Sequence, residues 1–387
     1  MILKRIISLC LCFCLLLTSA LCVLAKEEKQ SEMVNAKSAI LMEQSTGKVL
    51  FEKNPDEKLQ IASVTKTMTM LLIMEALREG KIKYTDMVTT SEHAASMGGS
   101  QVFLEPGEEM SVDDMLKAIC VSSGNDAAVA MAEHLSGSEE EFVSLMNKRA
   151  KELGAKNTNF INCNGLDETD EHFSTARDVA LISAELLKHE DIQKYTTIWM
   201  DTLRDGKFGL SNTNKLIRFY KGANGIKTGS TSKAKYCLSA SAKRNDMQLV
   251  AVVLCAPSTQ DRFQGATKLL DYGFANYEIA DGKTLSGMAK NNIKVIGGEK
   301  DFLMCEAEDS GNIVLKKGEA KKIEVKKSLP EEINAPVKKG EKLGELIYLL
   351  DGKEIARKNI VSSEDVNKIK FHKMYIKILK NWLIMSQ

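Results

Sequence analysis

The stretch YCLSASAKRNDMQLVAVVLC, residues 236–255, decides the fold. Its two halves, 236–242 and 247–255, are strand-like runs on either side of the turn residues Arg244, Asn245 and Asp246. This pattern predicts a β-hairpin. A second hairpin is predicted near the N-terminus, over residues 38–53, with its turn at Ser45-Thr46-Gly47.

Helical patterns fill the chain between these two hairpins. They cover residues 63–78, 111–120, 126–135, 139–153 and 175–189, and one more follows the late hairpin at 258–274. Strands at both ends with helices between them predict an α/β (α+β) domain over residues 26–275. We expect one mixed sheet, with the N-terminal hairpin beside the late strands and the helices in a separate lobe. A cleft is expected where the sheet meets the helices.

The sequence pattern changes near residue 276. Short apolar runs broken by Gly, Lys and Glu predict a small all-β domain over 276–362, with no candidate catalytic cluster. Residues 363–387 predict an amphipathic helix suited to lie in a membrane interface, with lysines on one flank. A helix packed on the protein's own surface is the alternative. The apolar positions recur every three or four residues: Phe371, Met374, Tyr375, Ile378, Trp382 and Met385.

The N-terminal segment predicts a cleaved signal peptide over residues 1–25. Lys4 and Arg5 precede an apolar run, and Val23-Leu24-Ala25 suits a signal peptidase. A retained membrane anchor is the alternative, although the apolar run is short for a bilayer span. The sequence therefore predicts an extracytoplasmic protein held on the outer face of the cytoplasmic membrane.

Charge and cysteine content exclude several classes of protein. The 53 Lys and Arg residues balance 52 Asp and Glu, so no basic excess suggests nucleic-acid binding. Of the nine cysteines, five remain after residue 25, without CxxC spacing. We therefore expect buried thiols, no disulfide framework, no metal site and no cofactor.

Ser63-Val64-Thr65-Lys66 could carry nucleophilic chemistry. On a helix, positions three apart share a face, so Lys66 would lie beside the Ser63 hydroxyl. The positive end of the helix dipole favours a developing alkoxide. Lys66 can accept the hydroxyl proton only when it is neutral, which burial or a nearby cation would favour. This four-residue pattern alone is common.

Two further triplets follow in the chain. Ser123-Gly124-Asn125 lies between two helical patterns, where a hydroxyl can relay a proton and an amide can bind substrate or Lys66. Lys227-Thr228-Gly229 precedes the late hairpin. On an edge strand, its lysine and threonine can bind a carboxylate, and its glycine allows close approach to the backbone. S-x-x-K, an S-D-N element and K-T-G in this order mark class A β-lactamases and penicillin-binding proteins.

The resemblance extends beyond the triplets. Residues 91–100 (SEHAASMGGS), 104–108 (LEPGE), 154–158 (GAKNT) and 175–178 (TARD) resemble low-molecular-mass penicillin-binding proteins of the D-alanyl-D-alanine carboxypeptidase type, peptidase family S11. The similarity covers residues 33–275, and the β-rich tail and terminal helix match the family's domain order. The resemblance implies a serine β-lactamase/transpeptidase-like catalytic domain.

The resemblance also implies roles for individual residues. Ser63 would attack the terminal D-Ala-D-Ala bond of a peptidoglycan stem peptide, and β-lactam antibiotics would acylate the same serine. Lys66 would act as the base, and Ser123 and Asn125 would take part in the proton relay and contact the substrate. The substrate carboxylate would be bound by Lys227, Thr228 and Gly229 together with Arg262. The backbone N–H groups of Ser63 and Ser230 would form the oxyanion hole. Some family members carry His where this chain has Ser230.

Three alternative functions use the same motifs. A β-lactamase would share the acylation residues, although secreted β-lactamases usually end after the catalytic domain. A DD-endopeptidase that cleaves peptide crosslinks would use the same residues. A non-catalytic penicillin sensor would be free to lose its motifs, yet all three are intact here.

Overall fold

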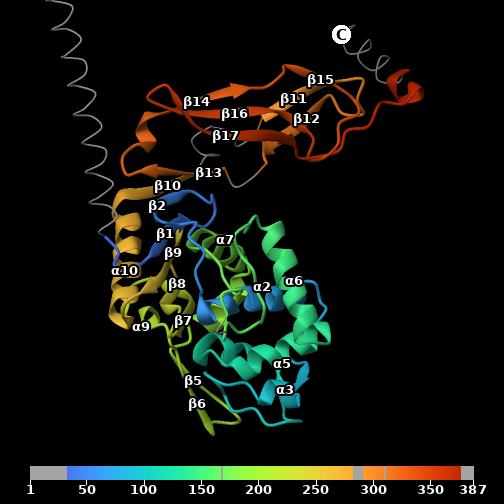
Figure 1. Cartoon of the computed structure of the whole chain (residues 1–387). Coiled ribbons are helices and arrows are strands. Elements are labelled where there is room, and N and C mark those ends of the chain that lie inside the picture. The colour runs from blue at the N-terminus through green and yellow to red at the C-terminus, as the bar shows by residue number, and fades with distance from the viewer. Residues whose placement is uncertain (1–32, 167–168, 282–290, 309–310, 376–387) are drawn as a thin grey trace, which may run out of the picture. The chain divides into compact units, whose positions relative to one another are not determined.

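The computed structural model describes residues 33–166, 169–281, 291–308 and 311–375 (Figure 1). The predicted signal peptide and residues 376–387 of the predicted terminal helix lie outside these ranges. The contacts within the chain divide it into two compact units, Met1–Ala275 and Asn276–Gln387.

The first unit is built on a five-stranded sheet with the strand order β2-β1-β9-β8-β7. The N-terminal hairpin lies beside the late strands as predicted, with Met42 of β1 opposite Val250 of β9. The sheet is antiparallel throughout, so the expectation of a mixed sheet was wrong. Strands of this sheet that follow one another along the chain are joined by short turns into hairpins, and the two strands of a hairpin pair antiparallel. The strands are β1 (Ser38–Glu43), β2 (Val49–Lys53), β7 (Ala223–Thr231), β8 (Lys235–Arg244) and β9 (Met247–Ala256).

Helices cover both faces of this sheet. On one face, α10 (Thr259–Asn276) approaches so closely that a Cβ on Gly273 would lie 2.5 Å from Leu249 Cδ1. On the other, α7 (Ala176–Leu186) packs against β1 and β9. Because both faces are covered, β9 is a continuous apolar run rather than an alternating one.

The remaining predicted helices of the first unit are confirmed with small changes at their ends. Ser111, Ser138 and Thr175 each begin a helix by accepting a hydrogen bond from the backbone N–H three residues later. The predicted helix at 63–78 starts with a 3₁₀ turn, and the one at 111–120 ends in a π-helical segment. These elements are η1 (Ala62–Thr65), α2 (Lys66–Arg78), α4 (Val112–Lys117), η2 (Ala118–Ser122), α5 (Asn125–Ser136) and α6 (Glu139–Glu152).

Short elements that the sequence did not predict complete this unit. Two small antiparallel sheets of two strands each, β3–β4 and β5–β6, lie outside the main sheet. The short elements are β3 (Met87–Thr89), α3 (Glu92–Ala95), β4 (Glu109–Ser111), η3 (Glu190–Ile192), α8 (Gln193–Thr196), β5 (Met200–Leu203), β6 (Phe208–Ser211) and α9 (Leu216–Phe219).

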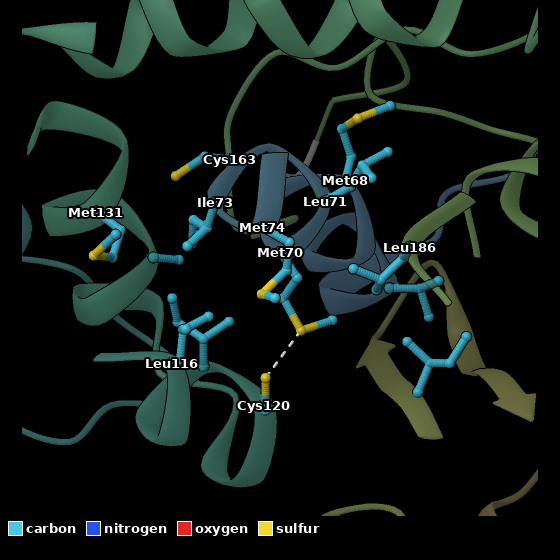
Figure 2. Close-up of a cluster of buried hydrophobic side chains, with 14 of the residues drawn as sticks. Met68, Met70, Leu71, Ile73, Met74, Leu116, Cys120, Met131, Cys163 and Leu186 are labelled. Atoms are coloured by element: carbon cyan, nitrogen blue, oxygen red, sulfur yellow. Dashed lines mark hydrogen bonds between the residues drawn. The ribbon is translucent and has the colours of Figure 1, made fainter. Parts of the chain in front are cut away.

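Helix α2 runs through the centre of the helical lobe. Figure 2 shows its Met70 directed toward Cys120, whose thiol lies 3.2 Å from Met70 Sδ. Burial raises the pKa of the Cys120 thiol to about 12. Cys120 is therefore an inert core residue despite its nearness to Ser123 in sequence. The other labelled side chains of this buried cluster come from α2 itself and from other segments of the first unit. They are Met68, Leu71, Ile73, Met74, Leu116, Met131, Cys163 and Leu186.

The second unit is rich in strands, in two sheets. One is six-stranded, in the order β14-β16-β17-β12-β11-β15, and the other pairs β10 with β13. Leu303, Leu346, Tyr348 and Ile360 are fully buried in its core. The strands are β10 (Tyr277–Asp281), β11 (Asn291–Ile296), β12 (Phe302–Ala307), β13 (Asn312–Lys316), β14 (Ile323–Ser328), β15 (Glu332–Asn334), β16 (Lys342–Leu350) and β17 (Lys353–Ser362), and η4 (Ala320–Lys322) is a 3₁₀ turn.

The chain stays bonded to this β unit beyond residue 363, where we expected the terminal helix to begin. The Val366 side chain is 2% exposed, and its backbone N–H donates to Val337 O. The Ile369 N–H donates to Gly297 O at 2.9 Å. Residues 371–375 are helical, and Phe371 is 80% exposed. No helix within the described ranges is long and apolar enough to cross a membrane.

Replacement of Met70 by Ala should lower the free energy of unfolding by about 2–5 kcal/mol, because it leaves a cavity in a closely packed core. Met200→Ala is the matched control, since Met200 is 68% exposed, and it should change stability by less than about 0.5 kcal/mol. Urea unfolding followed by tryptophan fluorescence measures both. Equal effects of the two substitutions would contradict the central position of α2.

Candidate active site

Ser63 and Lys66 meet where the 3₁₀ turn η1 passes into α2. Ser63 lies in the turn and Lys66 is the first residue of the helix, so both are at its N-terminal end. Lys66 Nζ lies 3.1 Å from Ser63 Oγ. The two side chains are thus in contact, as their three-residue spacing predicted, and the positive end of the helix dipole faces the serine.

The Lys66 side chain is completely buried among neutral oxygens. Besides Ser63, its Nζ contacts Asn125 Oδ1 at 2.5 Å and the backbone oxygen of Asn164 at 2.8 Å. Burial is the main cause that holds the pKa of Lys66 well below its usual value, and the positive charge of Lys227 adds to it. This environment favours the neutral amine, the form that can accept a proton from Ser63.

The Ser123-Gly124-Asn125 loop faces Lys66 through its asparagine. The π-helical segment before it ends at Ser123, which has a left-handed backbone (φ 65°, ψ 31°). Strain of this kind is a feature of functional sites. The buried Ser123 hydroxyl has no hydrogen-bond partner within the described part of the chain. Asn125 Nδ2 donates to Gly98 O at 2.7 Å, which leaves its Oδ1 for Lys66.

Strand β7 carries Lys227, Thr228 and Gly229 at the edge of the five-stranded sheet. It lies against the Ser63 turn so closely that a Cβ on Gly229 would come within 2.7 Å of Ile61 O and 2.9 Å of Ser63 N. Only glycine fits this approach. Burial lowers the pKa of Lys227 to about 7.

The other predicted binding residues surround the same strand. Thr228 Oγ1 donates to Thr213 Oγ1 at 2.7 Å, a partner that no sequence motif indicated. Ser230 is exposed at the end of the strand. Arg262 of α10 donates from Nη1 to Gly229 O at 3.1 Å, so its contact with β7 in this structure is to the backbone.

The loop of residues 162–166 is the part of the site that we did not predict, because nothing in its spacing tied it to Ser63. Its Asn164 carbonyl contacts Lys66, and a Cβ on Gly165 would lie only 2.0 Å from Ala62 O. The loop is held by Glu139 of α6, whose Oε1 accepts the Cys163 N–H at 2.9 Å.

The second oxygen of Glu139, Oε2, lies 3.0 Å from His93 Nε2. The hydrogen bond to Glu139 raises the pKa of His93. No group of three His, Cys, Asp or Glu residues in the described ranges is arranged to hold a metal ion.

Comparison with known proteins identifies the family. Residues 25–258 match the family model described as D-alanyl-D-alanine carboxypeptidase, peptidase S11. The chain is 50% identical to the D-alanyl-D-alanine carboxypeptidase DacF of Bacillus subtilis, over 98% of this chain and 99% of that protein. The chain belongs to the S11 D-alanyl-D-alanine carboxypeptidase family.

Other S11 carboxypeptidases and solved structures agree with this assignment. DacC of Escherichia coli is 37% identical over 89% of this chain and 87% of its own. The crystal structure of penicillin binding protein 5 from Haemophilus influenzae superposes with a TM-score of 0.76, at 35% identity over 87% of this chain and 98% of that one. Residues 279–368 match the model of the C-terminal domain of penicillin-binding protein 5. The α/β transpeptidase-like fold with a C-terminal β domain is thereby confirmed.

The buried lysines of this S11 carboxypeptidase should make its stability depend on pH. Burial lowers the pKa of Lys227 to about 7 in the folded protein, whereas an unfolded lysine has a pKa of about 10.4. Between these values the unfolded chain therefore binds more protons. The free energy of unfolding should therefore rise with pH across this range, by about 1 kcal/mol per pH unit for this group. The pKa of Lys66 is shifted in the same direction.

Lys227→Met should make the pH dependence shallower and stabilise the protein at pH 7, because it removes a buried ammonium. Lys243→Met, at an exposed position of β8, is the control and should leave the slope unchanged. Chemical denaturation at a series of pH values measures the slope. An unaltered slope in Lys227→Met would mean that Lys227 stays hydrated in the folded state.

Proposed function

We propose that this chain is a serine-type D-alanyl-D-alanine carboxypeptidase that removes the terminal D-alanine from peptidoglycan stem peptides through an acyl-enzyme on Ser63. The contact of 3.1 Å between Lys66 Nζ and Ser63 Oγ, in a pocket that favours the neutral amine, is the observation that carries this proposal. Membership of the S11 family supplies the substrate class.

Acylation begins with transfer of the Ser63 hydroxyl proton to the neutral Lys66 amine. Ser63 Oγ then forms a bond to the carbonyl carbon of the penultimate D-alanine, and the carbonyl oxygen becomes an oxyanion. The backbone N–H groups of Ser63 and Ser230 stabilise that charge. When the C–N bond breaks, the proton passes from Lys66 through Ser123 to the leaving amine of the terminal D-alanine.

Substrate binding depends on β7. Lys227 and Thr228 receive the terminal carboxylate, and an approaching anion favours the charged form of a lysine whose pKa is about 7. Because Gly229 has no side chain, the Ser63 turn can lie against the β7 backbone, and the substrate can bind along the same strand. Asn125 contacts the substrate amide. Arg262 holds β7 in place by donating a hydrogen bond to the backbone oxygen of Gly229.

Hydrolysis completes the reaction. Water attacks the ester carbon and gives a proton to Lys66. The ester bond to Ser63 Oγ then breaks, and Lys66 returns the proton to that oxygen. The shortened peptide leaves as a free acid, and Ser63 and the neutral Lys66 are restored. A β-lactam presents the same carbonyl and carboxylate, but its amine stays tethered after ring opening. We expect such a drug to remain as a long-lived ester on Ser63.

We further propose that the protein works outside the cytoplasm, after removal of residues 1–25, at the outer face of the cytoplasmic membrane. Phe371 and Tyr375 are exposed on the helical turn 371–375, and Lys370 and Lys373 lie beside them in the sequence. Exposed aromatic rings next to lysines suit the interface between acyl chains and anionic headgroups.

Ser63→Ala should abolish release of D-alanine from a peptide ending in D-Ala-D-Ala, whereas the wild type removes one alanine. Mass spectrometry of the peptide before and after incubation measures this. The same variant should lose covalent labelling by a fluorescent penicillin, because both reactions need the Ser63 oxygen. Labelling that survives in Ser63→Ala would show that the nucleophile lies elsewhere.

The wild type also distinguishes the alternative functions. A β-lactamase would turn over a chromogenic β-lactam many times, whereas a carboxypeptidase of this kind should stop near one equivalent. Cleavage of crosslinked dimer peptides in preference to linear stems would identify an endopeptidase.

Truncation after Lys370 should release the mature protein from anionic lipid vesicles without changing its carboxypeptidase rate. This cut keeps Val366 and Ile369, which are bonded to the β unit. Vesicle co-sedimentation of the chain from Lys26 onward, with and without residues 371–387, measures the effect. Equal sedimentation of the two forms would contradict attachment through the C-terminal segment.

A further inference from the structure

A cleft of about 520 Å³ opens beside the turn between β7 and β8. Gln60 on its wall stands three residues before Ser63, and Lys233 stands three residues after Ser230. The cleft is lined by Lys58, Leu59, Gln60, Asp170, Phe173 and Lys233.

Contacts among these segments hold the cleft together. Leu59 forms a backbone bridge with Ser174, which brings residues 58–60 alongside 170–173. Cys237 of β8 lies with its Sγ 3.8 Å from Gln60 O, and Cys237 is the register partner of Gly229. The cleft therefore adjoins the end of β7 that lies beyond the proposed oxyanion hole.

The two proposed substrate contacts on β7 give the bound peptide a direction. The terminal carboxylate lies at Thr228 and the scissile carbonyl at Ser230, two residues further along the strand. A strand advances by about 3.3 Å per residue, so the residue that precedes the acylated D-alanine lies near Thr231 and the β7–β8 turn. Among the described strands, β7 ends the sheet, so no further strand pairs with its outer edge, and an extended peptide can add there.

The cleft presents charges of both signs at this position. Lys233 Nζ lies 3.4 Å from Asp170 Oδ1, and Lys58 Nζ lies 4.9 Å from the centre of the Phe173 ring. Gln60 Nε2 donates to Asp170 Oδ1 at 3.3 Å. Gln60 Oε1 is buried and has no partner among the described residues, so it can accept a hydrogen bond from a ligand.

In peptidoglycan stems the residue before D-Ala-D-Ala is a diamino acid. Its side chain ends either in an ammonium alone, as in lysine, or in an ammonium and a carboxylate together, as in diaminopimelic acid. A lone ammonium would enter a cleft that already holds two lysines and one aspartate. An amino-carboxylate can place its carboxylate at the lysines and its ammonium at Asp170 and Gln60 Oε1.

We propose that this cleft is the subsite for the diamino acid of the stem peptide and that it selects a side chain ending in an amino-carboxylate. The inference rests on the proposed carboxypeptidase function. Lys58 and Lys233 bind the carboxylate, and Asp170 and Gln60 bind the ammonium. These residues determine specificity and take no part in bond breaking.

Three peptides test the subsite. They are identical except that diaminopimelic acid, lysine or norleucine precedes D-Ala-D-Ala. The wild type should cleave the diaminopimelic acid peptide with a kcat/KM about tenfold above that of the lysine peptide, the effect of one added charge-assisted hydrogen bond at a partly exposed site. Lys233→Gln and Lys58→Gln should each reduce this preference, and the double variant should abolish it.

Two controls separate the possible outcomes. Lys235→Gln makes the same charge change at an exposed position two residues from Lys233, and it should keep the preference. Cleavage of the norleucine peptide should be equal in all variants, which shows that they fold and acylate. Loss of all cleavage in the wild type would overturn the proposed function, whereas equal cleavage of all three peptides, or preference for lysine, would overturn the subsite alone.

Discussion

The site depends on one lysine nitrogen that is removed from water and held by neutral oxygens. Lys66 Nζ contacts a hydroxyl, a side-chain amide oxygen and a backbone carbonyl oxygen. A carboxylate in direct contact would instead have stabilised the ammonium and removed its basicity. The three oxygens come from η1, α5 and the 162–166 loop, so the correct packing of the helical lobe and the loop is a condition for a usable base.

The sequence predicted most of the residues of this site and missed those that reach it from loops. Spacing placed Ser63 and Lys66 on one helical face, and the two hairpins predicted four of the five strands of the sheet, β1, β2, β8 and β9. Asn164 and Thr213 could not be predicted, because they reach the site from loops whose course depends on tertiary packing. Asn164 in addition acts through a backbone oxygen, which every residue type possesses.

Smaller differences have similar physical causes. The expectation of a mixed sheet was wrong, because strands that lie far apart in sequence do not reveal the direction in which they pair. Strand β17, KEIARKNIVS, lacks a short apolar run of the kind that predicted the β domain, because charged residues interrupt its first half. Residues 364–369 contribute to the β unit through backbone bonds and the single buried side chain of Val366, a signal too small to be seen in hydrophobic periodicity.

The contact between Glu139 and the 162–166 loop has a consequence for how the protein loses function. Glu139 is the first residue of α6, so the loop that supplies the Asn164 oxygen is fastened to the end of a helix. Helix ends fray more easily than cores. Transient opening of that first turn would free the Cys163 amide, let water reach the Lys66 amine and restore its protonation, while the surrounding core remained folded. Such an opening would inactivate the base without unfolding the protein.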